Sequence, residues 1–154
     1  MALRKIILVA EDEAFLRKKS KPITQFDSSL HQLLNDMIQT LNHHNGAGLA
    51  AVQVGVLKRV FITKTMETGL NEYINPQIIE RSPKTKLVLE GCLSIPGRYD
   101  KVCRPTWVVV RAQDRNGNWF EQKLKGFAAQ AVYHENDHLD GIIYTDLISK
   151  EDKK

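Results

Sequence analysis

Apolar residues recur at helical spacing early in the chain. From residue 30 they fall one, three or four positions apart, at Leu30, Leu33, Leu34, Met37, Ile38 and Leu41. This spacing places them along one face of an α-helix. Asp27 or Ser28 can cap the start of the helix, and Gly46 can stop it, because these residue types favour the two helix ends. The pattern therefore predicts an amphipathic helix near the N-terminus.

The middle of the chain has a different pattern, in which short runs rich in β-branched residues alternate with turn residues. Such runs are typical of strands. They cover residues 59–63, 72–74, 77–80 and 86–89. Two further runs, 107–112 and 119–124, flank Asn116-Gly117, a dipeptide that favours a tight reversal. We therefore expect antiparallel strands, with the last two runs forming a hairpin.

A second helical pattern follows the strands. Its recurring residues are Phe127, Ala131, His134, His138 and Leu139, and no proline or glycine interrupts them before Gly141. This pattern predicts a helix over residues 127–139. A helix, then strands, then a helix is typical of an α+β fold rather than of regular βαβ alternation. We expect antiparallel sheets packed around the C-terminal helix, together with the N-terminal amphipathic helix.

Length and composition narrow the class of protein. The chain has 154 residues, 42% of them hydrophobic, and no repeat or linker divides it, so we expect one domain over residues 1–154. The early apolar run, residues 6–10, is too short for a signal peptide or a membrane span. With only two cysteines, a reducing, cytoplasmic compartment is expected, and an organelle stays open if a presequence is missing. The net charge of +4 permits an anionic partner such as RNA without indicating one.

The predicted C-terminal helix carries the motif His134-Glu135-Asn136-Asp137-His138. Residues four apart lie one above the other on a helix, so the two imidazoles can converge on one metal ion. Glu135 stands beside them and can reach a metal-bound water. The alternative is an ordinary helix surface on which the same residues are merely solvated.

Two imidazoles do not complete a catalytic metal site, which normally has three protein ligands and one open position. The longer metalloprotease motif places a third histidine six residues after the second, but that position is Tyr144. Little chain follows His138, and its candidate carboxylate is Glu151. The third ligand is therefore expected upstream. Besides carboxylates, the upstream candidates are His31, His43, His44, Cys92 and Cys103.

Cys92 is the most distinctive of these candidates. It lies in residues 90–97, where two glycines and a proline bend the backbone at the end of a predicted strand. Such a turn can present a thiolate inward. The alternative for Cys92 is a buried small hydrophobic residue, and this is the interpretation that we adopt for Cys103.

Three separated motifs make the sequence resemble the peptide deformylase family over nearly its whole length. They are Gly-Ala-Gly-Leu-Ala-Ala-Val-Gln at 46–53, Glu-Gly-Cys-Leu-Ser at 90–94 and His-Glu-Asn-Asp-His at 134–138. Leu16-Arg17, Lys21-Pro22 and Asn75-Pro76 are also similar to family landmarks. Together the three motifs are far more specific than the last one alone.

The resemblance implies a metal centre with Cys92, His134 and His138 as protein ligands and water as the fourth. It implies one divalent ion, with Fe(II) expected in the cell and Zn, Ni or Co in purified protein. A thiolate with two imidazoles suits several first-row ions, so ligand chemistry alone does not select the metal. The implied substrate is the N-formyl group of formylmethionine at the start of nascent polypeptides, released as formate after attack by a metal-activated water.

The resemblance also assigns the other site residues. Glu135 is implied as the general base, and the Gln53 side-chain amide and the Leu93 backbone N–H as donors to the oxyanion. We expect an apolar slot for the methionine side chain. The expected substrate-binding residues are Gly48, Gly91, Val88, Phe127 and Ala131.

Two departures from the family pattern lie near this slot. Tyr133 stands where the family usually has glutamine, and Gln130 stands where an apolar helix residue is expected. Neither is an implied ligand, so we expect them to affect the shape of the pocket rather than activity.

Other functions stay open on the sequence. A small metallopeptidase would release peptide fragments instead of formate, but it lacks a standard third ligand downstream. A cysteine hydrolase would use Cys92 as nucleophile and His134 as base, and it would be indifferent to chelators. A non-catalytic RNA-binding module would fit the positive charge, although the intact motifs argue against it. The expected partners are N-formylmethionyl peptides, with no membrane and no DNA, and ribosome contact through the tail, residues 149–154, is a hypothesis.

Overall fold

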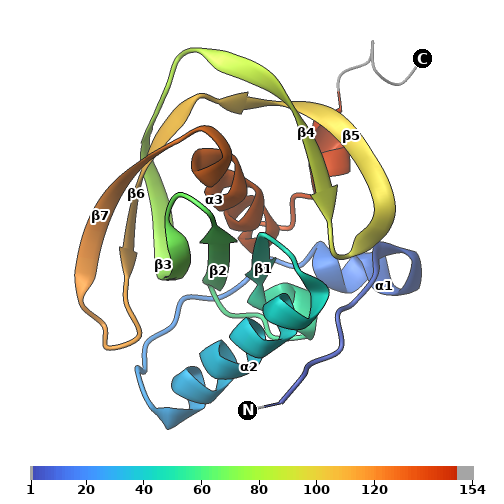
Figure 1. The fold of residues 1–154 in the computed structure, drawn as a ribbon. Coiled ribbons are helices and arrows are strands. Elements are labelled where there is room, and N and C mark those ends of the chain that lie inside the picture. Colours follow the sequence, from blue (N-terminus) through green and yellow to red (C-terminus); the bar gives the residue numbers. More distant parts are fainter. Residues whose placement is uncertain (1, 149–154) are drawn as a thin grey trace.

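The strands form two separate antiparallel sheets (Figure 1). The computed structural model describes residues 2–148. The larger sheet has the order β1-β2-β3-β6-β7, formed by Gly48–Ala50, Val60–Thr65, Gly69–Arg81, Trp107–Gln113 and Trp119–Lys125. The smaller sheet pairs β4 (Thr85–Cys92) with β5 (Ile95–Pro105). The predicted hairpin of residues 107–112 and 119–124 is confirmed as β6 and β7.

Three α-helices accompany the sheets. The amphipathic helix is confirmed as α2 (Ser28–His44), and the Asp27 side chain caps it by accepting a hydrogen bond of 3.1 Å from Leu30 N. Helix α2 stops at Asn45, which has a left-handed backbone (φ 53°), so the stop lies one residue before the predicted Gly46. The short helix α1 (Val9–Leu16) was not predicted, because its apolar residues follow no helical period.

Helix α3 (Gly126–Leu139) is the second predicted helix, and Figure 1 shows it enclosed between the two sheets. The α+β architecture with a central C-terminal helix is therefore confirmed. Two short 3₁₀ helices, η1 (Ala51–Val54) and η2 (Tyr144–Leu147), follow β1 and α3. Among the described residues, no helix is both long and apolar enough for a membrane span.

One prediction about the strands was wrong. Residues 72–74 and 77–80 belong to one strand, β3, because the chain passes Asn75-Pro76 with an irregularity of register instead of a break. Asn75 has φ 50°, and its side chain holds the kink by bonding both Ile23 N and Ile23 O at 2.8 Å. The bend expected within residues 90–97 is present, because β4 ends at Cys92 and a turn at residues 93 and 94 leads into β5 at Ile95. The long strand β5 itself was not predicted.

Two hydrophobic clusters fix the helices on the larger sheet. Helix α2 buries its apolar face against β2 and β3, where Ile62 and Ile74 are fully buried. Helix α3 contributes to the other cluster, whose sheet residues include Phe61, Tyr73 and Val110. Full burial of one such side chain stabilises a fold by roughly 1.5–3 kcal/mol. This packing holds α3 rigidly, and α3 carries the histidine motif.

Candidate metal centre

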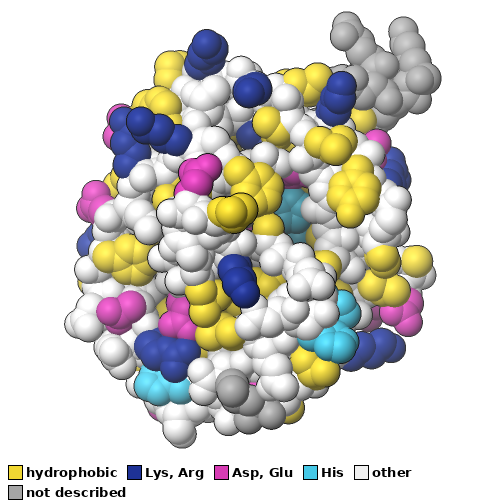
Figure 2. Space-filling view, viewed as in Figure 1, with side chains coloured by type: hydrophobic (Ala, Val, Ile, Leu, Met, Phe, Trp, Pro, Cys, Tyr) yellow, Lys and Arg dark blue, Asp and Glu magenta, His cyan; other side chains and the backbone are white. Residues whose placement is uncertain are grey.

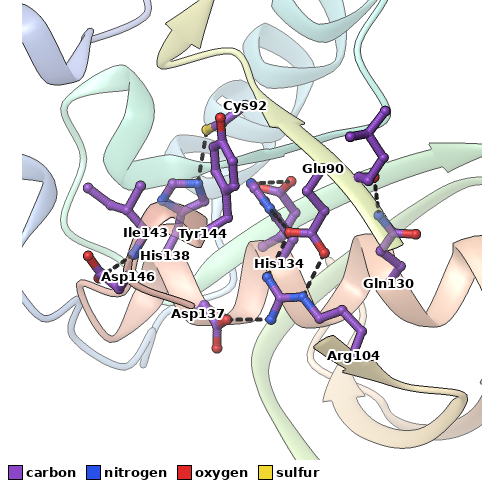
Figure 3. Close-up of polar contacts among 12 residues, drawn as sticks. Glu90, Cys92, Arg104, Gln130, His134, Asp137, His138, Ile143, Tyr144 and Asp146 are labelled. Carbon is purple, nitrogen blue, oxygen red and sulfur yellow. Dashed lines mark hydrogen bonds and ion pairs between the residues drawn. The ribbon is translucent and has the colours of Figure 1, made fainter. Parts of the chain in front are cut away.

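Cys92, at the end of β4, faces two histidines of α3 (Figure 3). One potential ligand atom from each of Cys92, His134 and His138 lies within 4.8 Å of the other two. The Cys92 Sγ and His138 Nε2 atoms are 3.4 Å apart. A tetrahedral ion with a metal–sulfur bond of about 2.3 Å and a metal–nitrogen bond of about 2.0–2.1 Å would separate its sulfur and nitrogen ligands by roughly 3.6 Å. The three side chains therefore fit the donor set and the spacing of a single divalent metal ion.

The electrostatics around His134 also suit a cation. Burial by itself lowers the pKa of His134, but the charges and hydrogen bonds of Glu135, Cys92 and Glu90 raise this pKa well above its ordinary value. Surroundings that favour a proton on His134 would equally attract a metal ion. For His138, burial lowers the pKa, and nearby positive charges lower it further. His138 is thus kept neutral, the form in which an imidazole binds a metal.

Glu90 orients the His134 ring by binding its Nδ1 atom. Its Oε1 lies 2.8 Å from His134 Nδ1, which leaves Nε2 of the same ring for the side of Cys92. Arg104 binds both carboxylate oxygens of Glu90, at 2.6 and 2.8 Å, and reaches Asp137 at 2.7 Å (Figure 3). Carboxylates that hold the second nitrogen of a histidine ligand fix its tautomer and orientation.

All members of this network are buried, and their charges compensate one another. Burial alone raises the pKa of Glu90, but the bonds and charges of Arg104 and His134 outweigh it and lower the pKa below its usual value. Burial alone lowers the pKa of Arg104, yet Glu90 and Asp137 raise it above its usual value. This network was not predicted, although Glu90 lies in the second family motif and Asp137 in the third.

Glu135 has the surroundings of an acid–base group. Burial raises its pKa to about 7, although the charges of His134 and Arg104 oppose this shift. The Glu135 Oε1 atom is buried and has no hydrogen-bond partner among the described residues. It can therefore accept a proton or a hydrogen bond from a small bound molecule. Its Oε2 atom lies close to Gly48 of β1. A Cβ atom added at Gly48 would be only 2.5 Å from Oε2. Only glycine leaves room for this carboxylate.

Gln53 lies beside Cys92. Its Nε2 donates to Ser94 Oγ at 3.0 Å and lies 3.5 Å from Cys92 Sγ, while its Oε1 accepts from Ala50 N at 2.9 Å. These contacts fix the amide so that its Nε2 lies between Ser94 Oγ and the thiol of Cys92. Ser94 was not predicted to take part.

A cavity of about 880 Å³ opens onto these residues. Figure 2 shows it as a hollow with histidine at its floor and hydrophobic side chains at its rim. The predicted site residues that line it are Gly48, Gln53, Gly91, Cys92, Leu93, Phe127, Ala131, His134 and Glu135. Val88 does not line it and packs against the larger hydrophobic cluster, because its side chain points to the inner face of β4. Leu89, the next residue, lines the cavity instead.

Comparison with known proteins agrees with this geometry. A family model described as polypeptide deformylase matches residues 4–154. Peptide deformylase of Caldicellulosiruptor bescii is 51% identical over 148 residues, which cover 96% of this chain and 87% of that protein. The chain belongs to the peptide deformylase family. Peptide deformylase 2 of Clostridium acetobutylicum is 46% identical over 151 residues, covering 97% of this chain and 98% of that protein.

Solved structures of the family show the same fold. The crystal structure of peptide deformylase from Thermotoga maritima superposes with a TM-score of 0.91 at 38% identity, covering 97% of this chain and 99% of that chain. The family predicted from the three motifs is therefore confirmed, and so is the enzyme class, a hydrolase that acts on formylated peptides.

The two departures from the family pattern have different surroundings. Gln130 lines the cavity, and its Nε2 donates to Leu89 O at 2.9 Å, which ties α3 to β4. Tyr133 faces another side of α3. Its hydroxyl accepts a bond of 2.7 Å from Arg81, and its ring lies 5.2 Å from the Arg104 guanidinium. Gln130 therefore affects the wall of the peptide deformylase cavity, whereas Tyr133 does not.

The other upstream candidate ligands lie outside this centre. His31 Nε2 is 2.9 Å from the Arg115 carbonyl oxygen. His44 lines the cavity and packs against the ring of His43, but it does not belong to the group of convergent ligand atoms. Cys103 is exposed on β5, so the prediction of a buried thiol was wrong. It is exposed because β5, which was not predicted, turns alternate side chains to solvent. Glu151 lies outside the described residues.

Tyr144, at the position of a third histidine in longer metalloprotease motifs, packs beside the centre. Its ring is 5.9 Å from the ring of His134, and its hydroxyl donates to Arg98 O at 3.0 Å. Tyr144, the first residue of η2, therefore closes one side of the site.

Proposed function

We propose that the chain removes the N-formyl group from formylmethionine at the start of nascent polypeptides and releases formate. The observation that carries this proposal is the meeting of Cys92, His134 and His138 beside a cavity that Cys92, His134 and the buried Glu135 line. Membership in the peptide deformylase family supplies the substrate class. N-formylmethionyl peptides are thus the proposed partner.

Cys92, His134 and His138 would hold one divalent ion. When bound, such an ion lowers the pKa of a coordinated water and polarises a carbonyl oxygen. Ligand softness is compatible with several first-row ions. Fe(II) in the cell, with Zn, Ni or Co in purified protein, is our proposal for the cofactor, and a reducing cytoplasm is our proposal for the compartment, because the thiolate must stay unoxidised.

Glu135 moves the proton. With a pKa of about 7 it can accept a proton from water and return it to the departing amine, since a base works best when its pKa lies near the working pH. The attack converts the planar formyl carbon into a tetrahedral centre, and the carbonyl oxygen gains negative charge. The Gln53 Nε2 amide and the Leu93 backbone N–H, which flank Cys92, would donate to that oxygen.

The cavity walls would select the substrate. Ala131 and Phe127 of α3 line it on one side, and Leu89 and Gly91 of β4 on the other. These mainly apolar walls suit an unbranched side chain such as that of methionine. The absence of a side chain at Gly91 leaves room for the ring of Tyr99, because a Cβ atom there would lie 2.5 Å from Tyr99 Cε1.

The test is a formate-release assay on formyl-Met-Ala peptide with protein purified without oxygen, together with elemental analysis. Formate in proportion to bound metal, with loss of both after chelation, is the expected result. Internal cleavage of an unformylated peptide would favour a metallopeptidase. Activity that survives chelation but not alkylation of Cys92 would favour a cysteine nucleophile.

A further inference from the structure

Both tryptophans of the chain lie on one face of the β6–β7 hairpin. Trp107 stands opposite Lys125 at one end, and Trp119 stands opposite Gln113 at the other. The two ends are about 20 Å apart, since six residues of strand separate positions 107 and 113. Odd-numbered residues of both strands share this face, while Val108, Val110, Ala112 and Leu124 point into the core.

A cation lies over each tryptophan. The Arg111 guanidinium is 4.2 Å from the centre of the Trp119 ring, and Lys123 Nζ is 4.4 Å from that of Trp107. Each pair joins diagonal neighbours of the two strands. Trp119 is nevertheless 49% exposed, so part of its ring stays open to a further stacking partner.

The charge of this face is positive. It carries Arg111, Lys123 and Lys125 against the single acid Glu121. Within residues 2–148, no carboxylate forms an ion pair with any of the three cations. Elsewhere on the surface Arg4, Arg17 and Arg115 are paired with acids. The face therefore combines an exposed ring, Trp119, and a half-buried ring, Trp107, with an excess of positive charge.

We propose that this face, formed by Trp107, Arg111, Trp119, Lys123 and Lys125, binds single-stranded RNA. Unpaired bases stack on exposed aromatic rings and on guanidinium planes, and the phosphates between them meet lysine and arginine. A base on Trp119 would complete a stack whose other side is Arg111. An acidic peptide would satisfy the charges but would leave the rings without a planar partner.

The face is separate from the metal centre. It lies on the side of the larger sheet that points away from α3, and none of its residues lines the catalytic cavity. RNA binding does not rest on the proposed function.

The experiment measures binding of a labelled oligouridylate of about 12 nucleotides to the full chain. Since the chain has no other tryptophan, quenching of its intrinsic fluorescence reports on this face directly. Three phosphate contacts predict that affinity falls by about 20-fold between roughly 50 mM and 200 mM salt. A duplex of the same length should bind weakly, because its bases are not free to stack.

Variants locate the site. Trp119→Ala should weaken binding at least about 5-fold, and Trp119→Phe should retain most of it, because phenylalanine still offers a ring. Lys123→Gln should weaken binding and reduce its salt dependence. Its control is Lys19→Gln, with the same charge change just after α1, which Figure 1 shows on the opposite side from β7. Formate release should stay normal in all four variants, which also shows that they fold.

Three outcomes would overturn the inference. One is no quenching of the wild-type protein at low salt. Another is an equal loss of affinity in Lys19→Gln and Lys123→Gln, which would indicate nonspecific attraction by net charge. The third is a change of oligomeric state in Trp119→Ala with unchanged RNA affinity, because the face would then be an interface between two copies of the chain.

Discussion

His134 Nδ1 lies 2.8 Å from Glu90 Oε1, and this contact joins the two motifs that build the site. Glu90 belongs to β4, two residues before Cys92, whereas His134 belongs to α3. The carboxylate therefore sets the orientation of one ligand from the strand that carries another. Arg104 extends this link to Asp137, on the same helix as His134.

Replacing Glu90 should weaken metal binding. Glu90→Gln keeps an acceptor of similar shape but loses the charge, and we expect metal affinity to fall about 10- to 100-fold. Competition with a chelator of known affinity measures this. Tyr99→Phe, in the same hairpin but at the exposed rim, is the control and should leave affinity unchanged. Equal affinity of Glu90→Gln and wild-type protein would contradict the role of this carboxylate.

Cys92→Ala should abolish stoichiometric metal binding, because two imidazoles remain of three ligands. The matched control is Cys103→Ala, which removes the other thiol of the chain from an exposed position on β5. It should keep both metal and formate release. Full metal occupancy of Cys92→Ala by elemental analysis would show that the cysteine is not a ligand.

Glu135→Gln should retain metal and fold while formate release falls roughly 100- to 10,000-fold, the contribution typical of a general acid–base. Glutamine has nearly the same shape, and its neutral amide suits the buried position. Metal content and the thermal unfolding midpoint separate lost chemistry from lost structure. Near-normal turnover in this variant would rule out the proposed proton transfer.

Gly48→Ala should displace the Glu135 carboxylate and so lower the rate of formate release. The added methyl group would lie 2.5 Å from Glu135 Oε2, so Glu135 must move away from the cavity. A displacement of about 1 Å at a catalytic group can cost 100-fold in rate. Gly69→Ala is the control, since nothing lies near that position, although its φ of 68° makes any side chain strained. It should lose some stability but no turnover, and an equal loss of turnover in both variants would contradict the steric explanation.

The residues that a sequence could identify are those whose chemistry is local. The helix of His134 and His138 follows from a spacing of four, and the family motifs led to Cys92. The partners Arg104 and Ser94 were missed because their positions depend on the pairing of β4 with β5, and β5 itself was hidden by proline and glycine at residues 96 and 97. Val88 was misplaced for the same reason, since one step along a strand reverses the face of the side chain.

Asp36 should make stability depend on pH at the N-terminal end of the fold. Burial alone raises the pKa of Asp36, but bonds from Ala2 N, Gln32 and Arg4 outweigh it and lower the pKa below its usual 3.8. A carboxyl whose pKa is lowered by folding stabilises the protein above its unfolded pKa, and that contribution is lost as pH falls through the folded value. Asp36→Asn should therefore cost about 1 kcal/mol at neutral pH, because the Arg4 side chain is partly exposed.

Urea unfolding of Asp36→Asn at neutral pH and at about pH 3 checks this dependence. The difference from the wild-type protein should be largest at neutral pH and should shrink in acid, where the wild-type carboxyl begins to be protonated. Asp27→Asn is the control on the same helix, because asparagine caps a helix about as well as aspartate. A stability difference for Asp36→Asn that is the same at both pH values would mean that its hydrogen bonds, and not its charge, join the N-terminal segment to α2.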